Sequence, residues 1–182
     1  MATVLRGDDN FDTADNATQT ELDNKVVGKV LQVVSTSKTD TWSGSAQGDT
    51  DITGMTVTIT PSSTSSKILI TVNLSCGANL GTYDMSVYLY RGTTKIAMGD
   101  AAGGRRQAMF EPVNRAYNQH ESWTVSNQYL DSPSTTSAQT YKLVFNQNGT
   151  GQTLHVNRSG ADEDSAGNSR TISTITAMEI SG

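Results

Sequence analysis

Histidine is the side chain most often used for acid–base chemistry near neutral pH, and this chain of 182 residues has two. His120 lies in the polar stretch 117–123, and His155 lies in residues 153–156, a pattern typical of a strand. A catalytic histidine needs a nucleophile and an orienting group, but the sequence has no Gly-x-Ser-x-Gly elbow and no phosphate-binding P-loop. We therefore expect no catalytic residue and no enzyme.

Metal-binding side chains are equally sparse. Cys76 is the one cysteine, so the chain can form neither an internal disulfide nor, with two distant histidines, a structural zinc site. Asp162, Glu163 and Asp164 offer carboxylates, but they lack the spacing of a calcium-binding loop. We expect a solvated acidic loop, no metal and no cofactor.

Two sets of polar and aromatic residues could bind a sugar or another surface ligand. Tyr117, Asn118, His120 and Trp123 form the denser set, and Trp42 is a second candidate. Aromatic and amide groups on loops are typical contacts for such ligands. The alternative is that both tryptophans simply pack at the edge of the fold.

Residues 99–106 (GDAAGGRR) have the composition of an anion-binding loop. They do not open a helix, so the usual phosphate cradle is absent. We predict a turn between strands, with Arg105 and Arg106 either exposed or paired across an interface.

The elements that position these residues are predicted to be β-strands. Apolar and polar residues alternate with a period of two from residue 26 onward, as in half-buried strands. Thr and Ser, with 26 and 20 residues, make up about a quarter of the chain and disfavour helices. Turn signals separate about nine or ten strands, which predicts an all-β antiparallel sandwich of the jelly-roll type.

The first and last predicted strands, residues 26–34 and 172–180, are apolar on both faces. A sandwich strand needs only one apolar face, so the second must be covered, either by loops of this chain or by another subunit. We favour a subunit interface, with both strands at an oligomer axis if they pair side by side. The interface candidates are Val30, Leu31, Val33, Val34, Ile175, Ala177, Met178 and Ile180.

Charge divides the chain into an N-terminal arm, residues 1–25, and a knob, residues 26–182. The arm has six acidic and two basic residues, which leaves the knob only −1 of the total net charge of −5. The arm has too few large apolar residues to fold alone. It is either a disordered leader or a segment that orders on a partner. In the second case the anchors are Val4, Leu5, Phe11 and Leu22.

Composition also disfavours several classes of partner. The chain has no net basic surface for nucleic acid. It has no run of 18 apolar residues for membrane insertion and no apolar segment near its start for secretion.

Several segments resemble a domain that is common in marine bacteriophage fibre proteins. They are residues 28–34, 51–61 (DITGMTVTITP), 67–70 (KILI), 130–137 (LDSPSTTS), 141–142, 156–159 (VNRS) and 173–180. The resemblance covers about residues 28–180. It implies a fold similar to the C1q/TNF-like jelly roll, in which three subunits form a knob.

This resemblance implies a virion surface protein, assembled in the host cytoplasm, with itself and other capsid or tail proteins as partners. About 25 residues precede the domain, enough for an attachment arm but not for a fibre shaft. We therefore expect a capsid decoration, a head-fibre knob or a small tail-associated knob that aids adhesion to the host. One alternative is a receptor-binding tail-fibre tip that recognises a host glycan. A second is a secreted carbohydrate-binding module.

Overall fold

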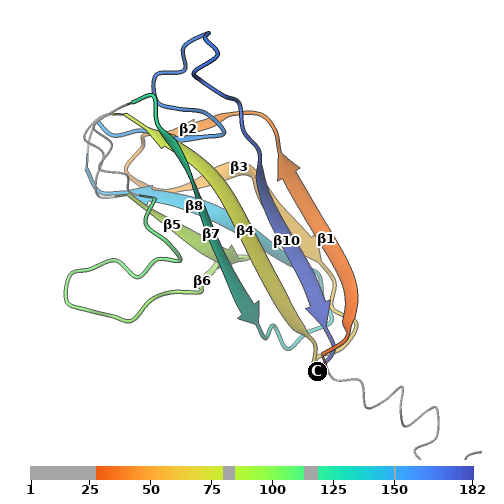
Figure 1. Cartoon of the computed structure of the whole chain (residues 1–182). Coiled ribbons are helices and arrows are strands. Elements are labelled where there is room, and N and C mark those ends of the chain that lie inside the picture. The colour runs from red at the N-terminus through yellow and green to blue at the C-terminus, as the bar shows by residue number, and fades with distance from the viewer. Residues whose placement is uncertain (1–27, 80–84, 113–118, 150) are drawn as a thin grey trace, which may run out of the picture.

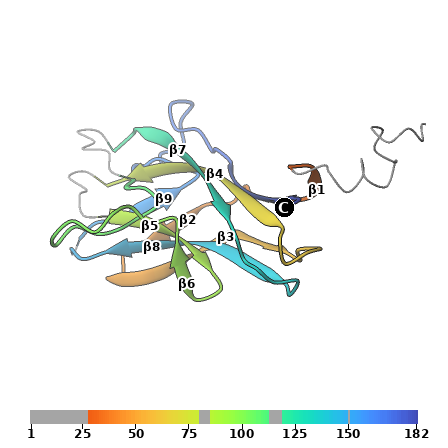
Figure 2. The same ribbon diagram turned by 90° about the horizontal axis from the view of Figure 1, so that it is seen from below.

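The computed structural model describes residues 28–79, 85–112, 119–149 and 151–182, and all regular structure in these residues is β-strand. Every strand pairing is antiparallel, and the strands form two sheets packed face to face (Figures 1 and 2). The described residues thus confirm the all-β antiparallel sandwich that the alternation of the sequence predicted. The predicted arm, with Val4, Leu5, Phe11 and Leu22, lies outside them.

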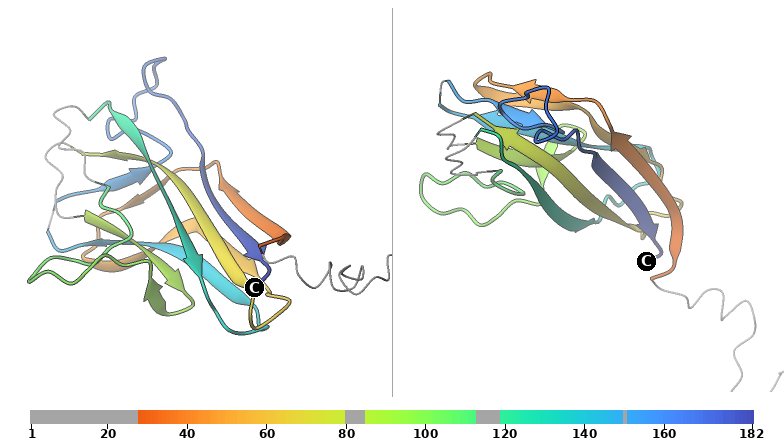
Figure 3. Two further views of the ribbon diagram at one scale, coloured as in Figure 1. Left: turned by 60° about the horizontal axis from the view of Figure 1, so that its bottom comes forward. Right: turned by 45° about the horizontal axis from the view of Figure 1, so that its top comes forward.

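The large sheet is built around four long strands that lie side by side (Figure 3). Their order is β1 (Val30–Lys38), β10 (Ser173–Ile180), β4 (Lys67–Ala78) and β7 (Ser122–Asp131). The first and last long strands are neighbours, because β1 pairs with β10 along its length.

Short strands extend the large sheet at the C-terminal end of β4. There β9 (Leu154–Val156) pairs with β4 on the same side as β10, and β2 (Trp42–Gly44) pairs with β9.

The small sheet has the order β3 (Gly48–Ile59), β8 (Gln139–Gln147), β5 (Met85–Arg91) and β6 (Thr94–Ile96). A register shift interrupts β3 between Asp51 and Thr56.

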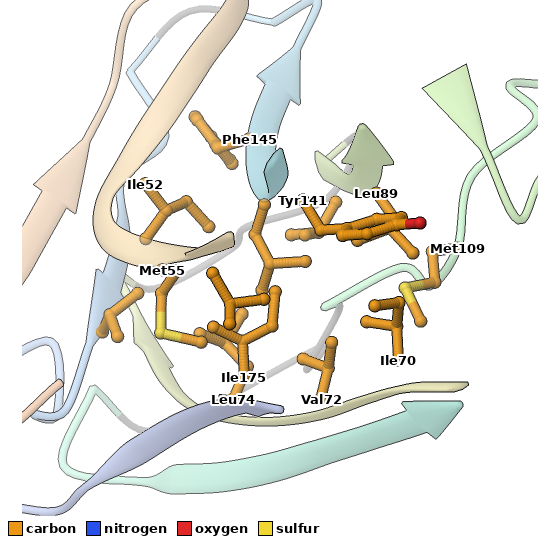
Figure 4. Close-up of a cluster of buried hydrophobic side chains, with 14 of the residues drawn as sticks. Ile52, Met55, Ile70, Val72, Leu74, Leu89, Met109, Tyr141, Phe145 and Ile175 are labelled. Carbon is orange, nitrogen blue, oxygen red and sulfur yellow. The ribbon is translucent and has the colours of Figure 1, made fainter. Parts of the chain in front are cut away.

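The core lies between the two sheets and consists of the inward-facing residues of their strands (Figure 4). Every second residue of β4, β5 and β8 is fully or almost fully buried there, as the alternation predicted. These residues are Ile68, Ile70, Val72, Leu74, Met85, Val87, Leu89, Tyr141, Leu143 and Phe145. Hydroxyl residues accordingly occupy many outward positions.

Two interface candidates of β10 lie inside the sandwich instead. Ile175 and Ala177 are fully buried in the core, so they cannot contact another subunit. Their place follows from the strand period of two, which turns Met178 and Ile180 outward. The prediction that Ile175 and Ala177 lie in a subunit interface is therefore wrong.

The interface candidates of β1 also divide between two faces. Val34 packs against the core and is half-buried, whereas Leu31 and Val33 are exposed. The sequence placed Val30 on the face of Val34, but Val30 is 48% exposed. A shift in the pairing register between Val30 and Gln32 breaks the alternation at this point.

The two ends of the described chain meet at one end of the sandwich. The Gly28 amide donates to Ser181 O (3.0 Å), and the Ser181 amide donates to Lys29 O (2.9 Å). Gly28 has φ +88°, a conformation in which glycine is favoured. The chain therefore enters and leaves the knob at the same pole, which we call the chain-end pole.

A buried carboxylate fixes this pole. Glu179 is fully buried and accepts hydrogen bonds from Gln32 Nε2 (2.6 Å), the Ser62 amide (2.7 Å) and the hydroxyls of Ser62 (2.6 Å) and Ser66 (2.7 Å). These bonds tie β1, β10 and the turn between β3 and β4 together.

Candidate functional site

The outward positions of β1, β10, β4 and β7 form a surface with almost no charge, which we call the uncharged face. Lys67 is the one charged side chain at these positions in the four described strands, and its Nζ donates to the Ser132 hydroxyl (2.8 Å). The other members that are exposed or half-buried are aliphatic, hydroxyl or amide side chains: Leu31, Val33, Ser35, Ser37, Leu69, Thr71, Asn73, Ser122, Thr124, Ser126, Gln128, Leu130, Thr174, Thr176, Met178 and Ile180.

Four of these side chains form an apolar row across the sheet. Val33 pairs with Met178, Met178 with Leu69, and Leu69 with Leu130, so one register line crosses all four strands. Val33 is 56% exposed and Leu130 is 53% exposed. The apolar row thus leaves two large aliphatic side chains in water at its ends.

The apolar row continues toward the chain-end pole, where Leu31 and Ile180 are also outward. Leu31 is 43% exposed. Contiguous apolar surface of this kind is typical of a site that another protein covers.

On the other side of the apolar row lie polar residues that bond to one another. The hydroxyls of Ser35 and Thr176 are 2.8 Å apart, and the Ser126 hydroxyl donates to Asn73 Oδ1 (2.6 Å). Polar groups that already have partners can be covered at lower cost than bare ones. This part of the uncharged face is therefore also suited to a protein contact.

The outer face of the small sheet has the opposite character. Lys142 Nζ lies 2.8 Å from both carboxylate oxygens of Asp51, and Lys95 Nζ lies 3.2 Å from Asp49. Lys95 also lies over the Tyr88 ring, 3.9 Å from its centroid. The two outer faces of the sandwich are thus chemically distinct, and one of them carries paired charges typical of a solvated surface.

The predicted ligand-binding residues do not form one described cluster. Tyr117 and Asn118 lie outside the described residues. His120 is exposed, with Nδ1 3.9 Å from Glu163 Oε2. Trp42 packs edge-on against Phe145 (ring centroids 5.9 Å apart) at the margin of the core.

Trp123 also packs against the core, and its indole Nε1 is buried without a hydrogen-bond partner among the described residues. In the described part of the chain both tryptophans therefore pack against the core, which is the alternative to ligand binding that the sequence left open.

His155 is buried and uses both ring nitrogens. The Ser43 hydroxyl lies 2.8 Å from Nδ1, and Nε2 lies 2.9 Å from Asn79 Oδ1, which assigns the proton to Nε2. Burial, with the nearby charge of Arg158, lowers the pKa of His155 to about 4. The imidazole is therefore a neutral, weakly basic tie between β9, β2 and the end of β4.

The acidic segment around residue 162 is held by arginines. Arg170 Nη1 donates to Asp162, Arg158 Nη1 lies 3.3 Å from it, and the bond from Arg170 lowers the pKa of this carboxyl. Among the described residues, no group of three or more His, Cys, Asp or Glu side chains is placed to hold a metal ion.

Sequence reasoning missed Leu69 and Leu130, which complete the apolar row. The signal was present for Leu69, because residues 68–70 (ILI) are apolar on both faces of their strand, as in the first and last strands. Leu130 belongs to β7, where the polar Asn127 interrupts the inward alternation and conceals the strand.

No protein-family model matches this sequence, and no curated protein matches it either. In the parts of the chain that the structure describes, we find no helix with the length and apolar character needed to span a lipid bilayer.

Proposed function

We propose that this chain is a virion protein of a bacteriophage, a homotrimeric surface knob with a C1q/TNF-like jelly-roll fold. Residues 26–182 form the knob, and residues 1–25 attach it to the capsid or the tail. Its role is structural, and adhesion to the host surface is a second role.

The uncharged face is the observation that carries this proposal. Interface cores are depleted in charged residues, and an uncharged surface can meet its own copy without repulsion between like charges. The apolar row supplies aliphatic side chains that gain by leaving water. Association through this face follows from these contacts, and the number of three subunits comes from the resemblance to trimeric knobs.

The position of the chain ends supports attachment through the arm. Gly28 and Ser181 meet at the chain-end pole, so residues 1–25 join the knob there. The opposite pole and the outer face of the small sheet are then free to point away from the particle.

Light scattering after size-exclusion chromatography tests the trimer. We expect the wild type to have three times the 19.4 kDa mass of the chain. Val33→Asp places a charge in the apolar row and should give monomers. The control is Met98→Asp, which alters a 47% exposed apolar residue that follows β6 of the small sheet and should leave the trimer intact. A monomeric wild type, or equal effects of both variants, would contradict the proposal.

Infection assays separate the structural role from the receptor-binding alternative, which the pocket described below favours. Loss of a decoration knob should leave adsorption and infection largely intact. Loss of a receptor-binding tip should abolish adsorption, and that result would replace the proposed role with the alternative.

A further inference from the structure

A pocket of about 550 Å³ opens at the edge of the small sheet. Its walls are the start of β5, the residue after β8, and residues 99–111, part of the green loop that stands out from the sandwich in Figure 1. The loop is fixed to the sheet where the Val87 amide donates to Phe110 O (2.9 Å) and the Met109 amide donates to Val87 O (3.1 Å). One wall of the pocket is therefore part of the sheet itself.

The described residues that line the pocket have a positive charge balance, in a protein of net charge −5. The basic residues are Arg105 and Arg106, and Glu111 is the one acidic residue among the described lining residues. Arg106 Nη1 donates to Asn146 Oδ1 (3.1 Å), which holds this side chain against the small sheet.

Arg105 is the more available cation. Its Nη1 donates to Ala102 O at 3.3 Å, and no carboxylate among the described residues pairs with it. A guanidinium has five N–H donors in a planar fork that fits a carboxylate. Among the described residues, the side-chain contact of Arg105 is with Ala102 O alone, which leaves guanidinium donors for a ligand.

The rest of the lining suits a sugar. Phe110 offers part of an aromatic ring, which can pack on the apolar C–H face of a pyranose, and Ser86 and Asn148 offer a hydroxyl and an amide. The volume is within the range of small-molecule sites, about 300–1,000 Å³.

The pocket lies far from the proposed trimer contact. Arg91, at the end of β5, pairs with Asp131 (2.8 Å), the residue after Leu130 of the apolar row. The pocket is at the other end of β5, at Met85 and Ser86, roughly 20 Å away at the usual rise of a strand. A knob that is held at its chain-end pole presents the pocket outward.

We infer that this pocket binds an acidic saccharide, with the carboxylate of a uronic acid unit on Arg105 and the sugar ring against Phe110. The inference goes beyond the proposed structural role and does not depend on subunit association, because all its residues come from one chain.

Isothermal titration calorimetry with trigalacturonate tests this inference at low and at physiological salt. We expect saturable binding to the wild type and to the Val33→Asp variant, so that failure of the trimer and failure of the pocket are separate results. Arg105→Gln should weaken binding about tenfold or more, since it removes a charge-assisted bond to the carboxylate. Maltotriose, which is neutral, should not bind.

The matched control is Arg170→Gln, which removes the same charge from a loop outside the pocket and should bind as the wild type does. Equal weakening by both arginine variants would reveal nonspecific attraction and overturn the inference. Absence of trigalacturonate binding would overturn it too, and so would competition by inorganic phosphate at the same concentration as the uronate, since the sugar would then contribute nothing.

Discussion

Glu179 is a carboxylate that the fold removes from water, and no cation among the described residues forms an ion pair with it. Burial raises its pKa, but the hydrogen bonds from Gln32, Ser62 and Ser66 outweigh burial and lower the pKa to about 2 from its ordinary 4.5. The strand period places residue 179 on the buried face with Ile175 and Ala177. Its serine partners are more than 100 positions away, so the sequence could not reveal that a buried acid would be fully bonded.

Glu179→Gln should destabilise the knob by about 2–3 kcal/mol at pH 7, because the amide replaces an acceptor oxygen with a donor that faces other donors. Urea unfolding measures this loss. Asp100→Asn, at an exposed position, is the control and should change the unfolding free energy by less than about 0.5 kcal/mol.

The difference in unfolding free energy between the wild type and Glu179→Gln should also depend on pH. A carboxyl group whose pKa is lower in the folded than in the unfolded protein stabilises the fold at pH values above its unfolded pKa, here 4.5. This stabilisation is lost as the pH falls toward 2. The difference in unfolding free energy between the wild type and Glu179→Gln should therefore become smaller as the pH falls from 5 to 3. A gap that stays constant over this range would contradict the assigned role of the charge.

At the scale of elements, β4 is the strand on which the large sheet depends, because it pairs with β10, β7 and β9. At its far end Gly77 lies against the loop that follows β9. A Cβ atom at residue 77 would come within 2.3 Å of Arg158 O and 2.7 Å of Ser159 Cα, and both are backbone atoms. The close approach of this loop to the sheet therefore requires glycine.

Gly77→Ala should lower the unfolding free energy by about 1–3 kcal/mol, the usual cost of overpacking, and should lower the thermal midpoint. Gly99→Ala is the matched control, since nothing lies within 4 Å of a Cβ there. An unchanged midpoint for Gly77→Ala would show that the loop moves aside without cost.

The sequence predicted the strands that alternate strictly but not how they pair. The inward residues of β3, β4, β5 and β8 follow the alternation, and the burial of Met55, Val57 and Ile59 was foreseeable. The exposure of Val30 was not, because it depends on a register shift that arises only when β1 meets β10. The pocket was not foreseeable either, although residues 99–106 suggested an anion-binding composition, because its wall comes from β5 and β8.

At the scale of the whole molecule, the two sheets have different outer faces and the two poles have different contents. The uncharged face suits a second copy, the chain-end pole suits attachment, and the pocket lies at the other pole. The proposed association, attachment and saccharide binding thus use three separate surfaces and would not compete with one another.

Deletion of residues 2–25 should prevent incorporation into phage particles while leaving a folded trimer, because the described core and the apolar row lie within residues 28–182. Mass spectrometry of purified particles measures occupancy, and Arg105→Gln, which keeps the arm, is the control with full occupancy. Undiminished occupancy after the deletion would contradict an anchoring role for the arm.

The antiparallel pairing of β1 with β10 has a mechanical consequence. Suppose that a force pulls residue 28 away from the knob while the opposite pole is held. The force then acts on the first residue of β1 and along the axis of this strand. The hydrogen bonds across eight register pairs then share the load in shear instead of opening one after another. A particle tethered through this knob would strain the whole length of its outermost strand before that strand could peel away.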